Sequence, residues 1–501
     1  MQPLYEVLKL GAKKNSFSDK FIVEKSTALL NAESKKILSV SVGVFTGDSK
    51  LSGDKISYSG KAVFYLCYLD EDGAIKKLET PSEFSGEYKV NNPDDICGYT
   101  VSVNAEKTDY FLEGDTITLK AYMLADGEID LCQTVSAFSG GDNIIADKKE
   151  ISYEKGFGKK SSVYPLEEEF DLNFQVKDVV CQNVDAVITS VQCGIGSIIV
   201  DGEAYLRVLL LQNQEKSDII KEERTIPFRV EIECDEAMPQ MTATASVLVR
   251  GLKTDISVDE NTGKSSVSSS IVLSFIGEAF IEDKTEILFD AFSTAEEIEI
   301  EKTNGILYSP EKHSVCDATV SGRAIIDELN IGSRVVATCD EKFEKVSLER
   351  KDSITIISGV LSMKVYLKDA DGVVVCKTLE TPISFTCDEP MAGACEIEHI
   401  ILAKNSYARL ISLGEIEIGA SLKILQKCKT HTEFSFICKA LSLGEKTPCT
   451  FPISVYIARR GEDLWTLSKR LGVCPDSLIE TNKDLNFPLT GDERIVVYRQ
   501  K

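Results

Sequence analysis

Apolar and polar residues alternate along most of the chain, and one alternating pattern appears three times with the same turn residues. Each copy passes through a glycine, turns at Asp/Gly or Asn/Gln residues, and returns to a proline that follows Thr or Ile. This pattern is typical of a β-hairpin. The anchoring glycines, Gly60, Gly202 and Gly359, lie about 140 to 160 residues apart, which is the size of a domain rather than of a solenoid repeat.

The residues around each hairpin favour further strands. β-branched runs precede the hairpins, for example residues 36–42, 185–191 and 332–338, and amphipathic helical patterns are scarce. We therefore expect a mainly β protein with three tandem antiparallel, sandwich-like domains. The expected organisation is a leader over 1–16, β repeats over 17–153, 154–303 and 304–446, a linker over 447–452, and a different domain over 453–501.

The pattern changes to a helical period in the last fifty residues. Leu464, Leu467, Ser468 and Leu471 fall at the spacing of a buried helical stripe, and Gly472 is suited to end that helix. A second short helix is expected to begin at Pro475, with Leu478 and Ile479 buried, and Asn482 is placed to bind the following loop through its side chain. The two flanking strands are expected to pair Ile495 and Val497 against Val455 and Ile457.

This C-terminal stretch resembles a LysM domain, a small βααβ module. The positions that carry the resemblance are Tyr456, Gly461, Leu464, Trp465, Leu467, Val473, Leu478, Asn482 and Gly491. The resemblance implies binding of N-acetylglucosamine polymers, such as peptidoglycan or chitooligosaccharide, between two loops, here 460–464 and 483–489. The candidate binding residues are Arg460, Gly461, Glu462, Asp463, Leu464, Trp465, Asn486, Phe487 and Leu489.

One departure from the LysM pattern favours a protein partner over a sugar. Glu462 and Asp463 stand where Asp followed by Thr or Ser is usual, so the expected groove gains a second carboxylate. Trp465, the only tryptophan of the chain, has two open roles, namely packing beside the helical stripe or contacting a partner.

The order of three β repeats followed by a LysM-like tail resembles SPOCS-domain proteins of endospore-forming bacteria. This resemblance implies a non-enzymatic scaffold in the mother-cell cytoplasm at the forespore surface. It further implies that the chain binds the morphogenetic ATPase of the coat's basal layer and helps to tether the coat to the spore.

The net charge and the composition limit the classes of partner that the chain is expected to bind. The chain of 501 residues has a net charge of −24, and its tail from Pro452 holds eight basic and seven acidic residues, so the part of the chain before the tail carries all of the net negative charge. Such a body repels phosphate backbones and anionic lipid, which argues against nucleic acid. We expect no secretory signal and no membrane span, and we expect the fifteen cysteines, an odd number without a Cys-x-x-Cys motif, to be reduced and mostly buried.

Candidate catalytic and metal motifs are weak. The acidic segments 70–73 and 369–372 resemble the start of a calcium loop but lie in hairpin turns, and 156–161 lacks the first glycine and the hydroxyl of a phosphate loop. The pairs His313/Cys316 and Cys395/His399 could suggest zinc, but along a strand such spacings cannot chelate one ion. We therefore expect no metal, no cofactor and no catalytic residue.

Two functions remain as hypotheses. The first is a structural adaptor in spore coat assembly whose LysM-like domain docks a protein. The alternative is a peptidoglycan-binding or N-acetylglucosamine-polymer-binding protein with the β domains as spacers. Exposed edge strands in three similar domains leave self-association open.

Overall fold

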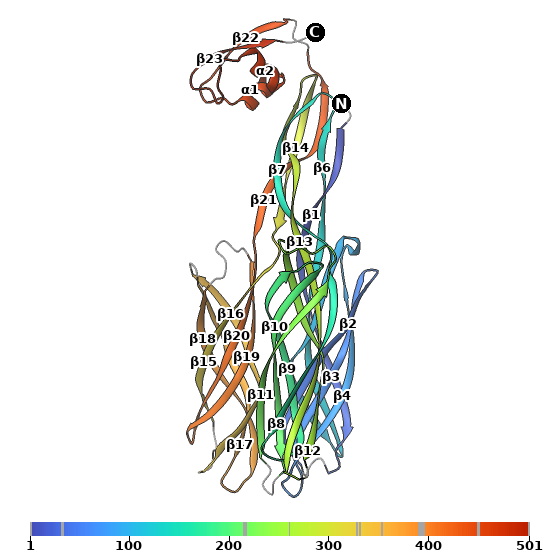
Figure 1. Cartoon of the computed structure of the whole chain (residues 1–501), viewed down its shortest axis with the longest axis vertical. Coiled ribbons are helices and arrows are strands. Elements are labelled where there is room, and N and C mark those ends of the chain that lie inside the picture. The colour runs from blue at the N-terminus through green and yellow to red at the C-terminus, as the bar shows by residue number, and fades with distance from the viewer. Residues whose placement is uncertain are drawn as a thin grey trace.

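The computed structural model describes residues 3–31, 35–213, 218–259, 261–326, 329, 332–351, 354–388, 396–447 and 451–498. Almost every element in these residues is a β-strand, so the expected mainly β fold is confirmed. The molecule has a wide body, a narrow stalk and a small head at the C-terminus (Figure 1).

Each β repeat contains a sandwich of two antiparallel sheets that pack face to face. The sheets have three strands each, except that one sheet of the second repeat has four, and the third repeat adds the separate two-stranded sheet β14-β21. The first repeat uses β1 (Pro3–Ala28), β2 (Lys36–Ser52), β3 (Lys55–Leu69), β4 (Ile75–Lys89), β5 (Ile96–Glu113) and β6 (Thr116–Gly141), with a 3-10 turn at Pro93–Asp95. The second uses β7 (Ile144–Gly156), β8 (Lys160–Leu172), β9 (Val176–Cys193), β10 (Ser197–Gln212), β11 (Ile219–Glu233), β12 (Thr242–Asp259) and β13 (Lys264–Ser293). The third uses β14 (Glu296–Tyr308), β15 (Lys312–Ile325), β16 (Arg334–Lys351), β17 (Ile354–Lys368), β18 (Val374–Asp388), β19 (Glu396–Ser412), β20 (Glu415–Lys429) and β21 (His431–Glu445).

The predicted hairpins form one sheet of each sandwich, in the strand orders β2-β3-β4, β9-β10-β11 and β16-β17-β18. The three anchoring glycines lie in the middle strands and are covered by aromatic rings of a neighbouring strand. A Cβ atom on Gly60 would lie 2.4 Å from the ring of Phe84, and one on Gly202 would lie 2.3 Å from the ring of Phe228. Glycine is therefore required because the ring occupies the space of a side chain.

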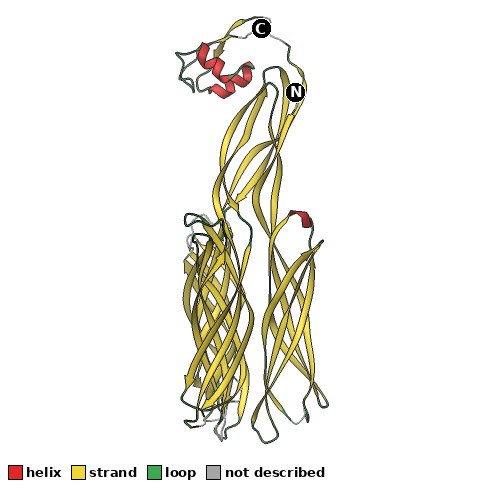
Figure 2. Cartoon of the chain, turned by 45° about the vertical axis from the view of Figure 1, so that its right-hand side comes forward, coloured by secondary structure: helices red, strands yellow, loops and turns green. Residues whose placement is uncertain are grey.

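The middle strands are buried on both faces, which distinguishes them from the outer strands. Ala204 to Leu211 of β10 form an unbroken buried run, since the outer face of this sheet packs against the corresponding sheets of the other two repeats. Residues of all three repeats, including Tyr65, Leu209 and Tyr366, share this central core. The body is thus three sandwiches around one common core, with all strands running along its length (Figure 2).

The stalk takes one two-stranded ribbon from each repeat, namely β1 with β6, β7 with β13, and β14 with β21. The ribbons pack around a narrow apolar core made of Leu8, Ala137, Phe138, Ile287, Leu288, Ala291, Leu307, Phe436, Ile437 and Ala440. Charged residues of the first and third repeats meet where the stalk joins the body, because Lys14 contacts Glu128 at 2.7 Å and Glu311 at 2.9 Å.

The limits of the repeats in the structure differ from the expected domain limits. The residues assigned to a leader, 1–16, include the stalk half of β1, which continues without a break into the first sandwich. The expected limits at 153/154 and 303/304 fall inside β7 and β14. The repeats meet instead at tight turns at the stalk tip, around Asn143, with a left-handed φ of 60°, and around residues 294–295, because a chain that leaves one ribbon must reverse to enter the next.

The head consists of β22 (Ile453–Ala458), α1 (Leu464–Leu471), α2 (Pro475–Thr481) and β23 (Glu493–Tyr498), the strand and helix order that was expected. Asp463 caps α1, Gly472 ends it with φ 64°, and Pro475 begins α2. Of the expected linker, residues 448–450 lie outside the described residues.

One pair of cysteines departs from the expected reduced state. Cys316 of β15 and Cys387 of β18 are bonded as a disulfide that joins the two sheets of the third sandwich. Others are buried as small apolar residues, as predicted, among them Cys67, Cys181 and Cys339. In the part of the chain that the structure describes, none of the helices combines the length and the apolar character needed to cross a membrane.

Candidate functional site

The two loops of the expected groove lie side by side in the head. The backbone N–H of Gly461 donates to the carbonyl of Leu489 at 2.8 Å, and the N–H of Leu489 donates to the carbonyl of Glu462 at 3.0 Å. Leu489 is buried and Phe487 packs against the core of the head, whereas Asn486 is exposed. The structure therefore brings the candidate residues of both loops together, with Leu489 acting in the core.

The two candidate carboxylates serve the head's own fold. Asp463 accepts hydrogen bonds from the backbone N–H and the hydroxyl of Thr466, both at 2.8 Å, and these bonds lower the pKa of its carboxyl group. Glu462 accepts the backbone N–H of Arg459 at 2.7 Å and pairs with Arg470 at 2.6 Å. Both acidic side chains are therefore engaged within the head rather than directed into the expected groove.

Asn482 binds within the head as a structural clamp. Its side-chain amide donates to the carbonyls of Leu478 at 2.9 Å and Val496 at 2.8 Å, and its carbonyl oxygen accepts the N–H of Val496 at 2.8 Å. The side chain thus ties α2 to β23 rather than to the loop between them.

Trp465 contacts the stalk of its own chain. Its indole N–H donates to Asp290 of β13 at 2.9 Å, and its ring meets that of Phe292 edge to face, with ring centroids 5.3 Å apart. Leu464 packs against the core of the head, while the side chain of Arg460 is exposed. The packing role left open for Trp465 is therefore observed, but its partner is the stalk.

The strand register of the head differs from the expected one and creates an apolar surface. Val455 pairs with Val496 and Ile457 with Arg494, so that Ile495 and Val497 point into the core while Val455 and Ile457 point away from it. Ile453, Val455 and Ile457 are 59%, 60% and 73% exposed. Helix α2 also differs, because Ile479 is 46% exposed rather than buried.

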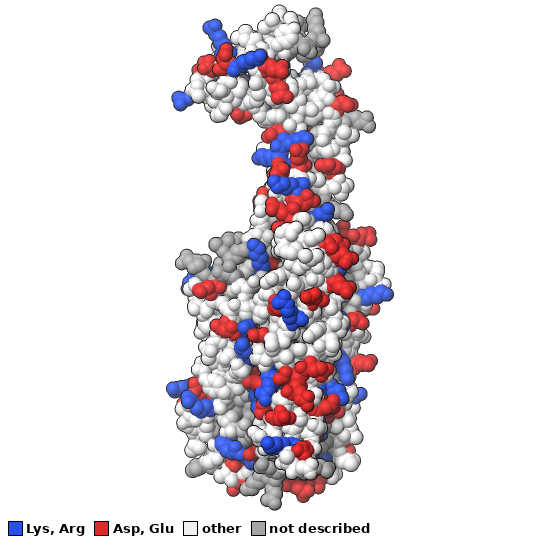
Figure 3. All heavy atoms as spheres, viewed as in Figure 1, with Lys and Arg blue, Asp and Glu red and all other residues white. Residues whose placement is uncertain are grey.

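We call this surface the outer sheet face and define it by Ile453, Val455, Ile457, Val496 and Tyr498. Three of these residues alternate along β22, and Tyr498 lies opposite Ile453 on β23. The uppermost described part of the head shows few charged side chains, whereas side chains of both signs are mixed over the lower part of the head, the stalk and the body (Figure 3). The alternation of Ile453, Val455 and Ile457 is the sequence signal for this face.

A buried ionic centre lies between the second and third repeats. The carboxylate of Glu341 lies 3.5 Å from Arg207 and 3.2 Å from Lys221, and Arg207 also pairs with Asp185. Burial alone would raise the pKa of Glu341, but the two positive charges outweigh burial and lower it. Since every charge has a partner of opposite sign, removal of one partner would leave a buried charge without compensation at the contact between the repeats.

The acidic hairpin turns are explained by their own backbone. Asp70 accepts the N–H of Asp72 at 3.1 Å and of Ala74 at 2.8 Å, and Asp369 accepts the N–H of Val373 at 2.8 Å. Such side-chain bonds to the following backbone are typical of Asx turns.

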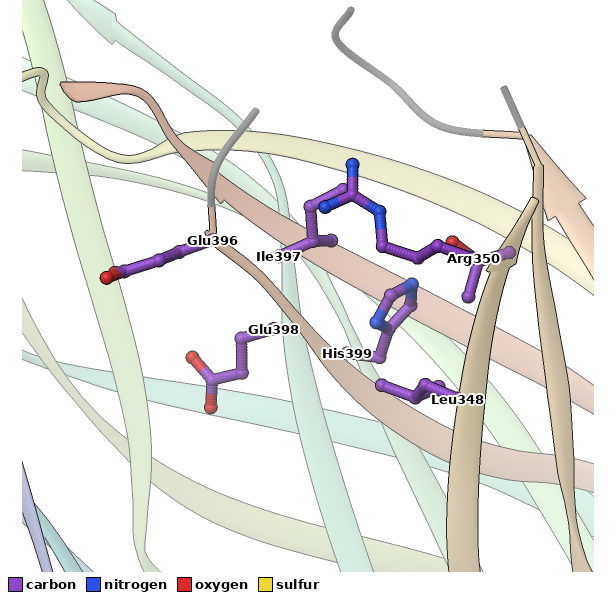
Figure 4. A pocket seen from close by; sticks show the side chains of 7 residues that line it. Leu348, Arg350, Glu396, Ile397, Glu398 and His399 are labelled. Carbon is purple, nitrogen blue, oxygen red and sulfur yellow. The ribbon is translucent and has the colours of Figure 1, made fainter. Parts of the chain in front are cut away.

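A hollow of about 400 Å³ opens at the shoulder of the third sandwich between β16 and β19. Arg350 and His399 face each other across it, while Glu396 and Glu398 point to the opposite side of β19 (Figure 4). We assign no function to this hollow.

Together these features define a mainly β, three-repeat protein that carries a small helical head on a stalk. Residues 175–257 match the family model described as SipL, SPOCS domain. The match covers β9, β10, β11 and most of β12, so the second repeat carries a SPOCS domain and the chain is similar to SipL there. Neither the curated proteins nor the solved structures contain a match to the chain.

Proposed function

We propose that this protein is a non-enzymatic structural adaptor in assembly of the endospore coat and envelope, and that its head docks a protein partner. The SPOCS match supports a role linked to sporulation. The resemblance of the head to LysM domains, together with the three β repeats, supports the morphogenetic ATPase of the coat's basal layer as the partner. The proposed location is the mother-cell cytoplasm at the forespore surface.

The outer sheet face is the observation that carries the docking proposal. A two-stranded sheet in a small domain covers its core with one face, and polar residues are expected on the other. Here the other face exposes Ile453, Val455 and Ile457 instead. Contiguous exposed apolar side chains mark sites of protein contact.

Charge at the edge of this face indicates the chemistry of the partner. Arg494 lies opposite Ile457 on the same sheet, and the exposed Arg459 and Arg460 follow directly after β22. An apolar partner strip bordered by carboxylates would complement this arrangement. We infer that the partner presents such an acidic-edged apolar strip to the head.

Binding of N-acetylglucosamine polymers is the alternative. The juxtaposed loops 460–464 and 483–489 favour it, since a groove that binds an oligosaccharide needs both loops in one place. The engagement of Glu462 and Asp463 within the head leaves the exposed Arg460 and Asn486 as the polar candidates of these loops.

A pull-down with the full chain tests the docking proposal. The double variant Val455→Arg/Ile457→Arg should lose the basal-layer ATPase, because two charges would enter the apolar contact. The matched control is Ile479→Arg, which places a charge at an exposed apolar position on α2 and should retain the partner. Unchanged capture by the double variant would contradict docking through the outer sheet face.

Titration of the same full chain with chitooligosaccharides distinguishes the alternative, glycan binding, from protein docking. We expect no saturable binding in the micromolar range. Saturable binding that survives the double variant but is lost on substitution of Asn486 would favour the glycan function and count against protein docking as the main role.

A further inference from the structure

The head is attached to the stalk by a specific polar and aromatic contact. Asp290 receives the indole N–H of Trp465 at 2.9 Å and the ammonium group of Lys469 at 2.7 and 2.8 Å to its two carboxylate oxygens. Phe292 meets the ring of Trp465 edge to face. One carboxylate and one ring of β13 therefore hold two successive turns of helix α1.

Strand β13 is shaped to present these two side chains. The register with β7 shifts between Leu288 and Asp290, so Phe289 forms a bulge in the ladder. A bulge re-aims the side chains that follow it. After it, Ala291 points into the stalk core, while Asp290 and Phe292, two residues apart on the same face of the strand, point toward the head.

The three stalk ribbons end in similar sequences, but only one fits helix α1. The tips read Ser136-Ala137-Phe138-Ser139, Asp290-Ala291-Phe292-Ser293 and Lys439-Ala440-Leu441-Ser442. The ring of Phe138 is covered by Tyr5 of its own ribbon, at 5.9 Å between centroids, and Phe292 is covered by Trp465, whereas Leu441 is 46% exposed.

Charge selects among these three tips. The residue before the alanine is Ser136 in the first repeat, Asp290 in the second and Lys439 in the third. Only the carboxylate of Asp290 can both accept the indole N–H of Trp465 and form an ion pair with Lys469. Lys439 at the third tip would repel Lys469. A further contact holds the chain at the second tip, because the ammonium group of Lys446 donates to the carbonyl of Ser293 at 2.6 Å.

We propose that Asp290 and Phe292 form an internal docking site for helix α1, which closes the Trp465 face of the head against the stalk and orients the outer sheet face away from the body. Trp465 and Lys469 are thus positioning residues, and a ligand of the α1 face must displace the stalk before it binds. This docking site rests on the contact geometry and holds whether or not the head binds a coat protein.

The chain offers a direct probe, because Trp465 is its only tryptophan. Fluorescence of the full chain, excited selectively at tryptophan rather than at its 16 tyrosines, therefore reports on the surroundings of Trp465 alone. The perturbing variant is Asp290→Lys, which lies on the stalk and leaves every residue of the head unchanged. The matched control is Glu286→Gln on the same strand, an exposed carboxylate that pairs with Lys148 at 2.9 Å.

In Asp290→Lys we expect a red-shifted emission maximum and a severalfold rise in acrylamide quenching of Trp465. Loss of a charge-assisted hydrogen bond shifts such a docking equilibrium by roughly ten- to hundredfold. Lys469→Asp, made on the head side, should give the same change, and the double variant Asp290→Lys/Lys469→Asp should restore part of the protection. Glu286→Gln should match the wild type.

Rescue by the charge swap distinguishes a specific contact from general damage to the fold, because two substitutions would increase general damage rather than reverse it. Wild-type quenching in both single variants would overturn the proposal. Equal quenching in the double variant and the single variants would overturn it as well, because the charges would then not select the contact. If Asp290→Lys fails to fold, Lys469→Asp alone decides between these outcomes.

Discussion

The sheets at the centre of the body and the sheet of the head differ in how many of their faces are covered. The central strand β10 is buried on both faces, and a paired ionic centre around Glu341 lies beside it. The sheet of the head packs one face on two short helices and leaves Ile453, Val455 and Ile457 exposed on the other. The body is therefore organised for stability, and the head has the free surface that recognition requires.

The largest expected effect comes from breaking the ionic centre. Glu341→Leu should lower the free energy of unfolding of the body by roughly 3–5 kcal/mol, because Arg207 and Lys221 would lose a buried partner. Denaturant unfolding, followed by far-UV circular dichroism, measures this change.

The matched control for this variant is Glu349→Leu. Glu349 is exposed and pairs with Lys351 at 3.0 Å, so its loss should change the free energy of unfolding by about 0–1 kcal/mol. Equal effects of the two substitutions would show that the centre does not stabilise the contact between repeats.

A smaller effect is expected from the core of the head. Leu467 is fully buried there, and Leu467→Ala should destabilise the head by about 2–5 kcal/mol. Because the core of the head is separate from the cores of the body, only the transition seen by Trp465 fluorescence should move, while the main circular dichroism transition stays. A shift of both transitions together would mean that head and body unfold as one unit.

The smallest effect concerns the cap of helix α1. Asp463→Ala should cost the head about 1 kcal/mol. Hydrogen bonds from Thr466 lower the pKa of Asp463, so its contribution is present above the unfolded pKa of about 3.9 and is lost as pH falls through the lower folded pKa.

The wild-type head should therefore lose stability relative to Asp463→Ala below about pH 4. Thermal unfolding of the two proteins at pH 7 and pH 3, followed by Trp465 fluorescence, measures the difference. A constant gap between the two proteins at both pH values would contradict this role of the cap.

Hairpins and the class of fold could be predicted from the sequence because their signals are local. The alternation around Gly60, Gly202 and Gly359 and the turns that follow them lie within short windows. The stalk could not be predicted in this way, since β13 is one alternating strand of 30 residues that passes from the sandwich into the stalk. The alternation continues where β13 leaves its sandwich partners β8 and β12 and begins to pair with β7 in the stalk. The sequence therefore contains no local signal for this change of partner strand.

The candidate site was predicted only in part. The LysM resemblance implied that the loops around Gly461 and Leu489 flank one groove, and the structure places these loops side by side. The register of β22 was wrong because both of its faces contain apolar residues, and the core uses small Ala458 and half-buried Tyr456 rather than Val455 and Ile457. The contact of Trp465 with Asp290 joins residues 175 positions apart, which alternation alone does not reveal.

Localisation in sporulating cells tests the central claim most directly. Full-length protein with a fluorescent tag is compared with its Val455→Arg/Ile457→Arg variant, and both are checked for equal abundance. The account predicts that the wild type rings the developing spore, whereas the variant stays diffuse in the mother cell. A variant that rings the spore as completely as the wild type would contradict the claim that the outer sheet face is where this protein docks.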